Sequence, residues 1–153
     1  MTPLAIYQTA LNRVSEAILA GDFDAYAVMI DLPYLVHTAT ADLLLTKLAD
    51  LRPTFDTLFQ GLKARGITHY ERVARAADYA DCDRIEGWHH THILSNGERM
   101  ANPHSARQTL VRRGDRWLFS EAHYDTIKAN HWHLTDADLF SHPDGRNASR
   151  ALL

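Results

Sequence analysis

The chain has 153 residues, and its net charge is −3 when its histidines are neutral. This length favours one domain, and a composition of 46% hydrophobic and 23% charged residues is typical of a globular protein. The weakly acidic balance argues against nucleic-acid binding, which needs a basic surface. The single cysteine, Cys82, excludes an intramolecular disulfide and a cysteine-based zinc site.

Membrane and export signals are also missing from the pattern. No uninterrupted apolar stretch reaches the ~18 residues that a membrane-spanning helix needs, so we expect no membrane partner. The first residues lack a basic region followed by an apolar run, so we expect no secretory signal and a cytoplasmic protein.

Two helices are predicted at the start of the chain. Thr2 followed by Pro3 is typical of a helix N-terminus, apolar residues then recur at helical spacing, and Gly21 is a stop signal. Asp22 is placed to cap a second, short helix. Pro33 is expected to end it.

A short strand and a third helix are predicted next. Residues 34–38 are aromatic and β-branched, which favours a strand. Thr40 is a suitable N-cap for a helix that starts with the leucines 43–45. Pro53 should kink or restart this helix, and Gly66 should end it.

Strands dominate after Gly66. Turn signals at Asn96–Gly97 and Gly114–Asp115 separate runs of strand-forming residues and predict an antiparallel meander. The predicted strands cover residues 67–80, 83–94, 98–113 and 116–125. Helices followed by a sheet indicate an α+β fold.

The last part of the chain carries one further helix signal. Residues 134–140 are expected to form a helical turn or more, with Thr135 as the cap and Asp138 completing a capping box. Residues 141–153 are small and polar and are predicted to be a frayed tail. We therefore expect one domain over residues 1–140 followed by the tail.

Five short segments, taken with this order of elements, carry a resemblance to a known superfamily. They are Gly21–Asp24, Thr68–Tyr70, Gly87–His89, His104–Ala106 and Gly114–Trp117. The chain resembles the nuclear transport factor 2-like (NTF2-like) superfamily. Within it, the chain is similar to the SnoaL-like branch, which includes scytalone dehydratase and the small subunits of ring-hydroxylating dioxygenases. The resemblance implies a cone-shaped α+β barrel in which three N-terminal helices pack on a curved antiparallel sheet and enclose a pocket.

Three histidines are the catalytic candidates. The resemblance to scytalone dehydratase implies that His69 faces the pocket, followed in alternation by Glu71 and Val73. By the same analogy His89 faces it from the next strand, and His37 lies on the helical side. An imidazole exchanges protons near neutral pH, so these groups suit acid–base catalysis. The alternative for each is a structural, hydrogen-bonded histidine.

Four further residues are candidates for substrate binding. The analogy places Arg107 and Tyr124 on the pocket side of the last two strands, and Tyr34 and Glu16 on the helical side. Arg107 suits a carboxylate or an oxyanion. Its alternative is an ion pair with Glu71 or Glu121, Glu16 could be an exposed helix residue, and the tyrosines could simply line a wall.

The opposite face of the sheet is expected to be partly apolar. By strand parity it carries Trp88, Leu110, Trp117 and Phe119, which should not be left in water. We therefore expect a homo-oligomer, a dimer or a trimer, through this outer sheet face. Four histidines on the same face could hold zinc, but we expect no metal. They are His90, His92, His104 and His123.

The sequence thus predicts a protein that binds a small hydrophobic or aromatic molecule. If it is catalytic, we expect a cofactor-free dehydration, isomerisation or cyclisation of a carbonyl compound. The alternative is a non-catalytic ligand-binding or oligomerisation module, such as the small subunit of a ring-hydroxylating oxygenase. Fold alone does not choose between them.

Overall fold

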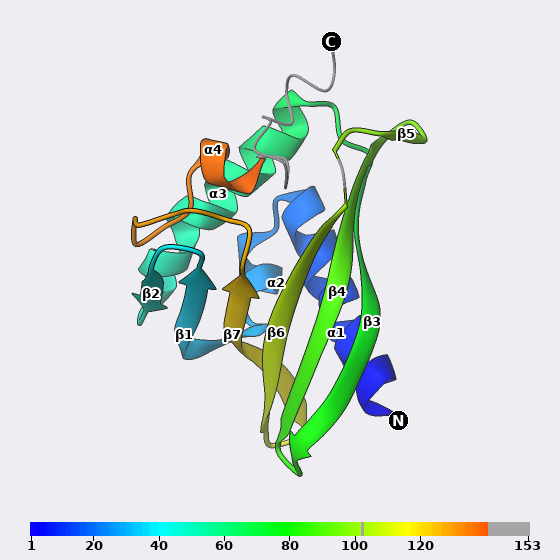
Figure 1. Cartoon of the computed structure of the whole chain (residues 1–153), viewed down its shortest axis with the longest axis vertical. Coiled ribbons are helices and arrows are strands. Elements are labelled where there is room, and N and C mark those ends of the chain that lie inside the picture. The colour runs from blue at the N-terminus through cyan, green and yellow to red at the C-terminus, as the bar shows by residue number, and fades with distance from the viewer. Residues whose placement is uncertain (102, 141–153) are drawn as a thin grey trace.

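In a computed structural model of the chain, helices cover one face of a curved sheet (Figure 1). The structure describes residues 1–101 and 103–140, and the predicted tail at 141–153 lies outside this range. Its helices are α1 (Pro3–Ala20), α2 (Phe23–Ala27), α3 (Leu48–Ala64) and α4 (Asp136–Leu139). Its strands are β1 (Ile30–Thr38), β2 (Asp42–Leu45), β3 (His69–Asp81), β4 (Arg84–Ser95), β5 (Glu98–Arg99), β6 (His104–Arg113) and β7 (Arg116–Tyr124).

The sheet runs in the order β2-β1-β7-β6-β4-β3, and β5 pairs with β4. β1 and β7 are parallel, whereas the other neighbours are antiparallel. The predicted α+β class and the meander from β3 to β7 are therefore confirmed. No helix in the described part of the chain is long and apolar enough to cross a membrane.

The first two helices begin and end where their capping residues predict. The Thr2 hydroxyl accepts a hydrogen bond from the Ala5 amide at 3.1 Å, and Gly21 ends α1 in the left-handed region at φ 71°. A carboxylate oxygen of Asp22 accepts from the Ala25 amide at 3.1 Å and starts α2. These short-range signals are confirmed because each satisfies a backbone group that the helix leaves unpaired.

The predicted start of the third helix is wrong. Residues 42–45 form β2, and α3 begins at Leu48 instead of after Thr40. Leu43 and Leu45 are buried while Leu44 between them is 58% exposed, which is the period of a strand. Pairing with β1 therefore overrides the helix propensity of three consecutive leucines. Pro53 lies inside α3.

The first strand also extends further than predicted. β1 begins at Ile30 and runs through Pro33, so α2 ends before the proline is reached. The pairing of β1 with β7 shifts register between Ile30 and Leu35. A proline is tolerated at such an irregularity because no regular ladder hydrogen bond is lost there.

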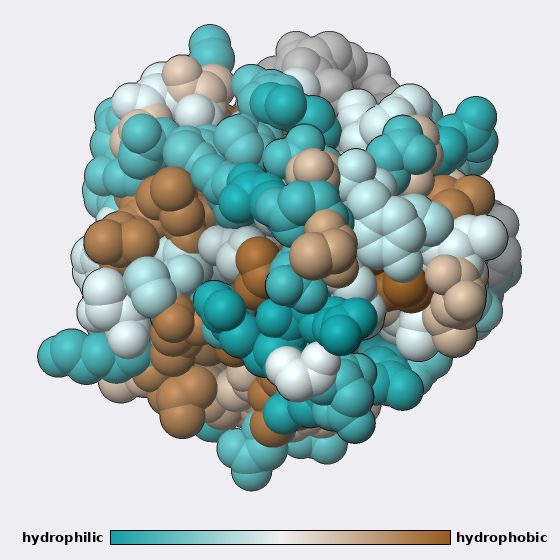
Figure 2. All heavy atoms as spheres, turned by 90° about the horizontal axis from the view of Figure 1, so that it is seen from below, coloured by the Kyte–Doolittle hydropathy of each residue, from teal (hydrophilic) through white to brown (hydrophobic). Residues whose placement is uncertain are grey.

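The core lies between the helices and the concave face of the sheet. Tyr7 and Leu11 of α1 and Ile85, Leu110 and Phe119 of the sheet are at most 1% exposed. At the end of the molecule seen from below, hydrophobic residues gather mainly along one side, among hydrophilic ones (Figure 2). A cavity lies within this core, between α1, α3 and the strands, and it is the candidate site.

Candidate ligand-binding pocket

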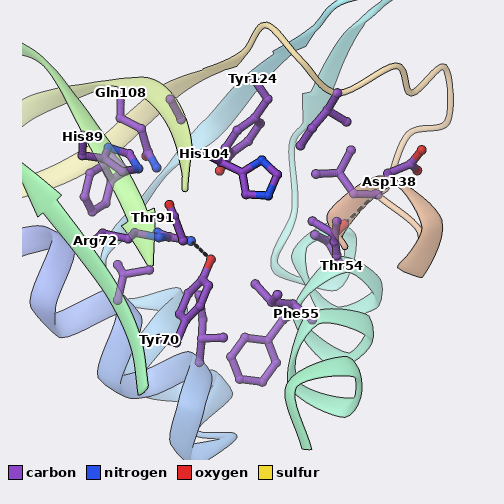
Figure 3. A pocket seen from close by; sticks show the side chains of 18 of the residues that line it. Thr54, Phe55, Tyr70, Arg72, His89, Thr91, His104, Gln108, Tyr124 and Asp138 are labelled. Carbon is purple, nitrogen blue, oxygen red and sulfur yellow. Dashed lines mark hydrogen bonds between the residues drawn. The ribbon is translucent and has the colours of Figure 1, made fainter. Parts of the chain in front are cut away.

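A cavity of about 110 Å³ lies between the concave face of the sheet and the helices. Apolar side chains such as Val14, Ile18, Phe55, Ile93 and Phe119 form much of its wall. Polar groups converge on it from five strands, and those of β3, β4, β6 and β7 are labelled in Figure 3. The ones that matter most are Tyr34, Tyr70, Arg72, His89, Gln108 and Tyr124.

Arg72 is a charged group buried in the wall of this cavity. Its side chain is only 8% exposed, and its terminal Nη2 donates a hydrogen bond to the Tyr70 hydroxyl at 2.7 Å. The guanidinium lies 5.0 Å from the centre of the Tyr70 ring, within range of a cation–π contact. Its Nε is buried and has no hydrogen-bond partner in the described structure. Arginine stays charged in proteins, so this is a buried cation.

His89 lies near Arg72 on the neighbouring strand and is paired with Tyr7. The Tyr7 hydroxyl and His89 Nδ1 are 2.7 Å apart, and His89 is 1% exposed. Burial lowers the pKa of His89 to about 3, and the charge of Arg72 adds to this effect. Burial also raises the pKa of Tyr7, so its hydroxyl keeps its proton, and we assign this hydroxyl as the hydrogen-bond donor and Nδ1 as the acceptor. We therefore assign His89 as a neutral imidazole with its own proton on Nε2.

A glycine makes room for this pair. A Cβ atom at Gly87 would lie 2.8 Å from the Tyr7 ring, which real contacts do not tolerate. Glycine at this position therefore lets α1 bring the Tyr7 ring against β4, two residues from His89.

Three tyrosines, of which Tyr34 is buried and the other two are half-buried, complete the polar part of the wall. Burial raises the pKa values of Tyr26, Tyr34 and Tyr124, so all three are neutral near pH 7. The Tyr34 hydroxyl donates a long hydrogen bond of 3.4 Å to Oε1 of Gln108. The pocket thus combines neutral donors and acceptors with the single positive charge of Arg72 among these groups.

Three of the predicted site residues lie in the pocket. His89, Tyr34 and Tyr124 all line it, from β4, β1 and β7 respectively. The other four lie elsewhere.

His69 is exposed and does not face the cavity. Its Nδ1 lies 2.9 Å from the Thr68 hydroxyl, whereas Tyr70 and Arg72 occupy the pocket side of β3. The assumed parity of this strand is wrong by one residue, so Glu71 and Val73 also point outwards. Glu16 is exposed too and shares a shallow surface groove along α1 and β3 with His69.

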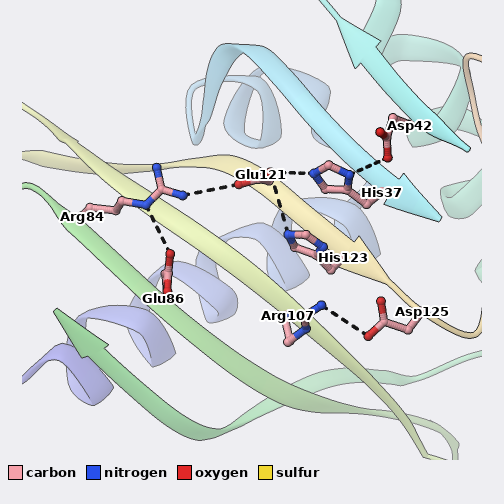
Figure 4. A network of polar contacts seen from close by, with 8 residues as sticks. All are labelled: His37, Asp42, Arg84, Glu86, Arg107, Glu121, His123 and Asp125. Atoms are coloured by element: carbon pink, nitrogen blue, oxygen red, sulfur yellow. Dashed lines mark hydrogen bonds and ion pairs between the residues drawn. The ribbon is translucent and has the colours of Figure 1, made fainter. Parts of the chain in front are cut away.

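Arg107 also lies on the outer face, where it is 59% exposed. It forms an ion pair with Asp125 at 3.6 Å, not with Glu71 or Glu121 (Figure 4). Its neighbours Ala106 and Gln108 face the pocket instead. The parity of β6 is therefore also the reverse of the predicted one.

His37 is part of an ionic network on the outer face (Figure 4). Its Nε2 lies 2.5 Å from a Glu121 carboxylate oxygen, and its Nδ1 lies 2.6 Å from Asp42. The hydrogen bond to Glu121 is the main cause that raises the pKa of His37. Its ring stacks on His123 at 4.2 Å, and burial together with His37 lowers the pKa of His123. The predicted catalytic set of His69, His89 and His37 is therefore not brought together.

Within residues 1–101 and 103–140, three potential metal ligands come together in this same network. Donor atoms of His37, Glu121 and His123 lie within 4.8 Å of one another. A carboxylate at each ring nitrogen favours a doubly protonated His37, and an imidazolium has no lone pair for a metal. Ion pairing is therefore a sufficient reason for this arrangement.

The outer face differs from the predicted one in three apolar residues, because Trp117 packs against the core and Leu110 and Phe119 are part of it. Leu110 is buried because β6 has the reverse of the predicted parity, and Phe119 is buried because the register shift between β6 and β7 turns this part of β7 inwards. Trp88 remains on the outer face at 39% exposure, close to His90. His104 lines the pocket rather than the outer face.

The sequence reasoning missed Arg72, Tyr70, Tyr7 and Gln108. Residues 69–72 are His-Tyr-Glu-Arg, so either parity of the strand buries one charged residue, Glu71 or Arg72. The aromatic Tyr70 was the available signal, because a strand more readily buries a tyrosine than His69.

Solved structures with this fold include several NTF2-like proteins. One of unknown function from Shewanella oneidensis has a TM-score of 0.58 and 11% identity, covering 80% of this chain and 98% of its own. A candidate dehydratase of the NTF2-like family from Streptomyces avermitilis has a TM-score of 0.59 and 14% identity, covering 84% and 100%. An NTF2-like protein from Novosphingobium aromaticivorans has a TM-score of 0.58 and 16% identity, covering 79% of each chain.

These likenesses confirm that the chain has the NTF2-like fold, and at such identities they show the fold alone. No protein-family model matches the sequence, and no curated protein matches it. The SnoaL-like branch stays a prediction.

Proposed function

We propose that this NTF2-like chain binds a small, mostly apolar molecule of about one aromatic ring in the interior pocket. The observation that carries the proposal is a cavity with apolar walls on which neutral tyrosine, histidine and amide groups converge. Few polar groups among apolar walls is the usual composition of a small-molecule site.

The size of the cavity limits the ligand. Its volume of about 110 Å³ is somewhat below the cavity of about 150 Å³ that binds benzene in an engineered protein. The largest ligand that we expect is therefore one ring with a small substituent, and the walls must move slightly to take it. Polycyclic molecules are too large for this pocket.

A proton-transfer enzyme of the dehydratase or isomerase type is the second candidate. It is favoured by His89, the one member of the predicted catalytic set that lines the pocket, and by the Streptomyces avermitilis neighbour described as a candidate dehydratase. A pKa of about 3 makes His89 a weak base near pH 7. Binding without catalysis is therefore the better-supported function.

The experiment is a thermal-shift screen with phenol, benzyl alcohol, benzamide and benzoate. A ligand at 100 times its Kd stabilises the fold by about 2.7 kcal/mol, which raises Tm by roughly 5–10 °C for a chain of this size. Ala106→Leu fills the pocket and should abolish the shift. Ala80→Leu, at an exposed position of β3, is the matched control and should keep it. Equal shifts in both variants would contradict the proposal.

Homo-oligomer formation through the outer sheet face also stays a proposal. Trp88 supports it, while the burial of Leu110 and Phe119 leaves the face less apolar than the sequence suggested. Sedimentation at micromolar concentration tests it: a dimer or trimer that Trp88→Glu dissociates is expected, and a monomer contradicts it. Co-purification with a larger oxygenase subunit would instead favour the small-subunit function.

A further inference from the structure

Arg72 is a buried cation whose counter-charge is not supplied by its described surroundings. Charged side chains are almost never fully buried unless they are paired, because removing the charge from water is costly. Arg72 is 8% exposed, yet within the described residues its guanidinium donates its hydrogen bond to a hydroxyl, that of Tyr70, and not to a carboxylate. The buried Nε has no partner among the described residues.

The acidic group that lines the same cavity is committed elsewhere. A carboxylate oxygen of Asp138 accepts hydrogen bonds from the Thr135 amide and hydroxyl at 2.9 and 2.7 Å. Figure 3 shows Asp138 on the side of the pocket opposite Arg72. Among residues 1–101 and 103–140, no carboxylate therefore lies beside the positive charge of Arg72 at the cavity.

We propose that the pocket selects a ring-sized carboxylic acid and that Arg72 binds the carboxylate of this ligand. The inference rests on the proposed function and names the class of its ligand. A guanidinium offers paired N–H groups that match the two oxygens of a carboxylate, and such charge-assisted bonds are stronger than neutral ones. The Nε–H of Arg72, which has no partner among the described residues, is one of the N–H groups that form such a pair.

The surroundings of Arg72 suit this ligand in two further ways. His89 is neutral and carries its proton on Nε2, so it adds a donor without adding a second charge. The apolar Phe55, Ile93 and Phe119 offer contacts for a ring, while the cavity of about 110 Å³ leaves room for little more than a ring and a carboxylate. A larger oxyanion such as a phosphate ester fits this space less well.

A structural role of Arg72 against the Tyr70 ring is the competing explanation, and it makes a different prediction. If Arg72 serves the fold, Arg72→Met destabilises the free protein and does not alter ligand preference. If Arg72 serves a ligand, the free protein tolerates Arg72→Met, since a buried charge replaced by an apolar side chain of similar size is often neutral or stabilising.

Benzoate and benzamide form a matched pair of probes, because they share size and shape but differ in charge. We expect calorimetry to show that the wild-type protein binds benzoate at least ~10-fold more tightly than benzamide, the difference that one charge-assisted contact gives. Arg72→Met should remove this preference and leave the benzamide affinity within about twofold. Arg75→Met, at an exposed arginine of the same strand, should keep the preference.

The outcomes separate this inference from the proposed function. Equal affinity of the wild-type protein for the two probes, or a benzoate preference that survives in Arg72→Met, overturns the carboxylate inference while ring binding stands. No binding of either probe or of phenol to the wild-type protein overturns both. The wild-type comparison needs no variant, so equal affinity for the two probes overturns the carboxylate inference even if Arg72→Met does not fold.

Discussion

The two faces of the same sheet use similar residues in opposite ways. On β7, Ala122 and Tyr124 face the interior, whereas Glu121 and His123 face outwards. The interior groups His89 and Gln108 are neutral and hydrogen-bonded, and Arg72 is a buried charge. On the outer face, Glu121 forms an ion pair with His37. Because charged groups are stable in water and costly inside, alternate residues of one strand acquire different chemistry.

The histidines make this contrast clearest. His89 on the inner face has a pKa lowered to about 3, while the pKa of His37 on the outer face is raised by its hydrogen bond to Glu121. Residue type alone therefore does not decide whether a histidine is a proton carrier, an ion-pair partner or a neutral hydrogen-bonding group. The face of the sheet decides it.

The largest expected contrast between the faces is in packing. Phe119→Ala removes a ring that is 1% exposed and should lower the free energy of unfolding by about 3–5 kcal/mol. Trp88→Ala, at 39% exposure on the outer face, should cost about 1 kcal/mol or less in the monomer. Urea denaturation measures both values. A similar cost for the two variants would mean that the assignment of the faces is wrong.

Acid should destabilise the protein through its inner histidine. The folded pKa of His89, about 3, lies below the ordinary value of about 6.5, so the unfolded chain binds one more proton between these values. Stability is therefore full above pH ~6.5 and falls below it, by about 2 kcal/mol at pH 5 from this group. Denaturation at pH 7 and pH 5 should show a smaller loss in His89→Gln. His69→Gln, at an exposed site, should leave the loss unchanged.

The smallest expected effect is the pH dependence of stability that comes from His37 on the outer face. Its sign is opposite to that from His89. The folded pKa of His37 is raised, so its contribution is full below the unfolded pKa of about 6.5 and is lost as pH rises through the folded value. The pair of His37 and Glu121 is near the surface, so its contribution to the free energy of unfolding should be at most about 1 kcal/mol. NMR titration should give a lower pKa for His37 in Glu121→Gln. An unchanged pKa of His37 in this variant would show that Glu121 is not the cause of the raised value.

Much of the fold could be predicted from the sequence because its signals are local. Thr2, Gly21 and Asp22 mark helix ends by satisfying nearby backbone groups, and glycine turns mark the hairpins. The strand at residues 42–45 could not be found this way. Its three leucines carry a helix propensity, and only pairing with β1 makes them a strand.

The site was harder to predict because it depends on strand parity. A one-residue error on β3 places His69 in the pocket, whereas the structure places Arg72 there. The same error on β6 places Arg107 in the pocket instead of Gln108. Register shifts between strands add to the ambiguity, as at Thr109 and Leu110. The chemistry of Arg72 is visible only once its burial and its lack of a counter-charge are known.

A crystal structure of the protein grown with benzoate would test the central claim most directly. The ring should lie in the interior cavity against Phe55 and Ile93, with the carboxylate within about 2.7–2.9 Å of the Arg72 guanidinium nitrogens. Benzoate bound only on the outer face, or within the cavity with its carboxylate turned away from Arg72, would contradict it.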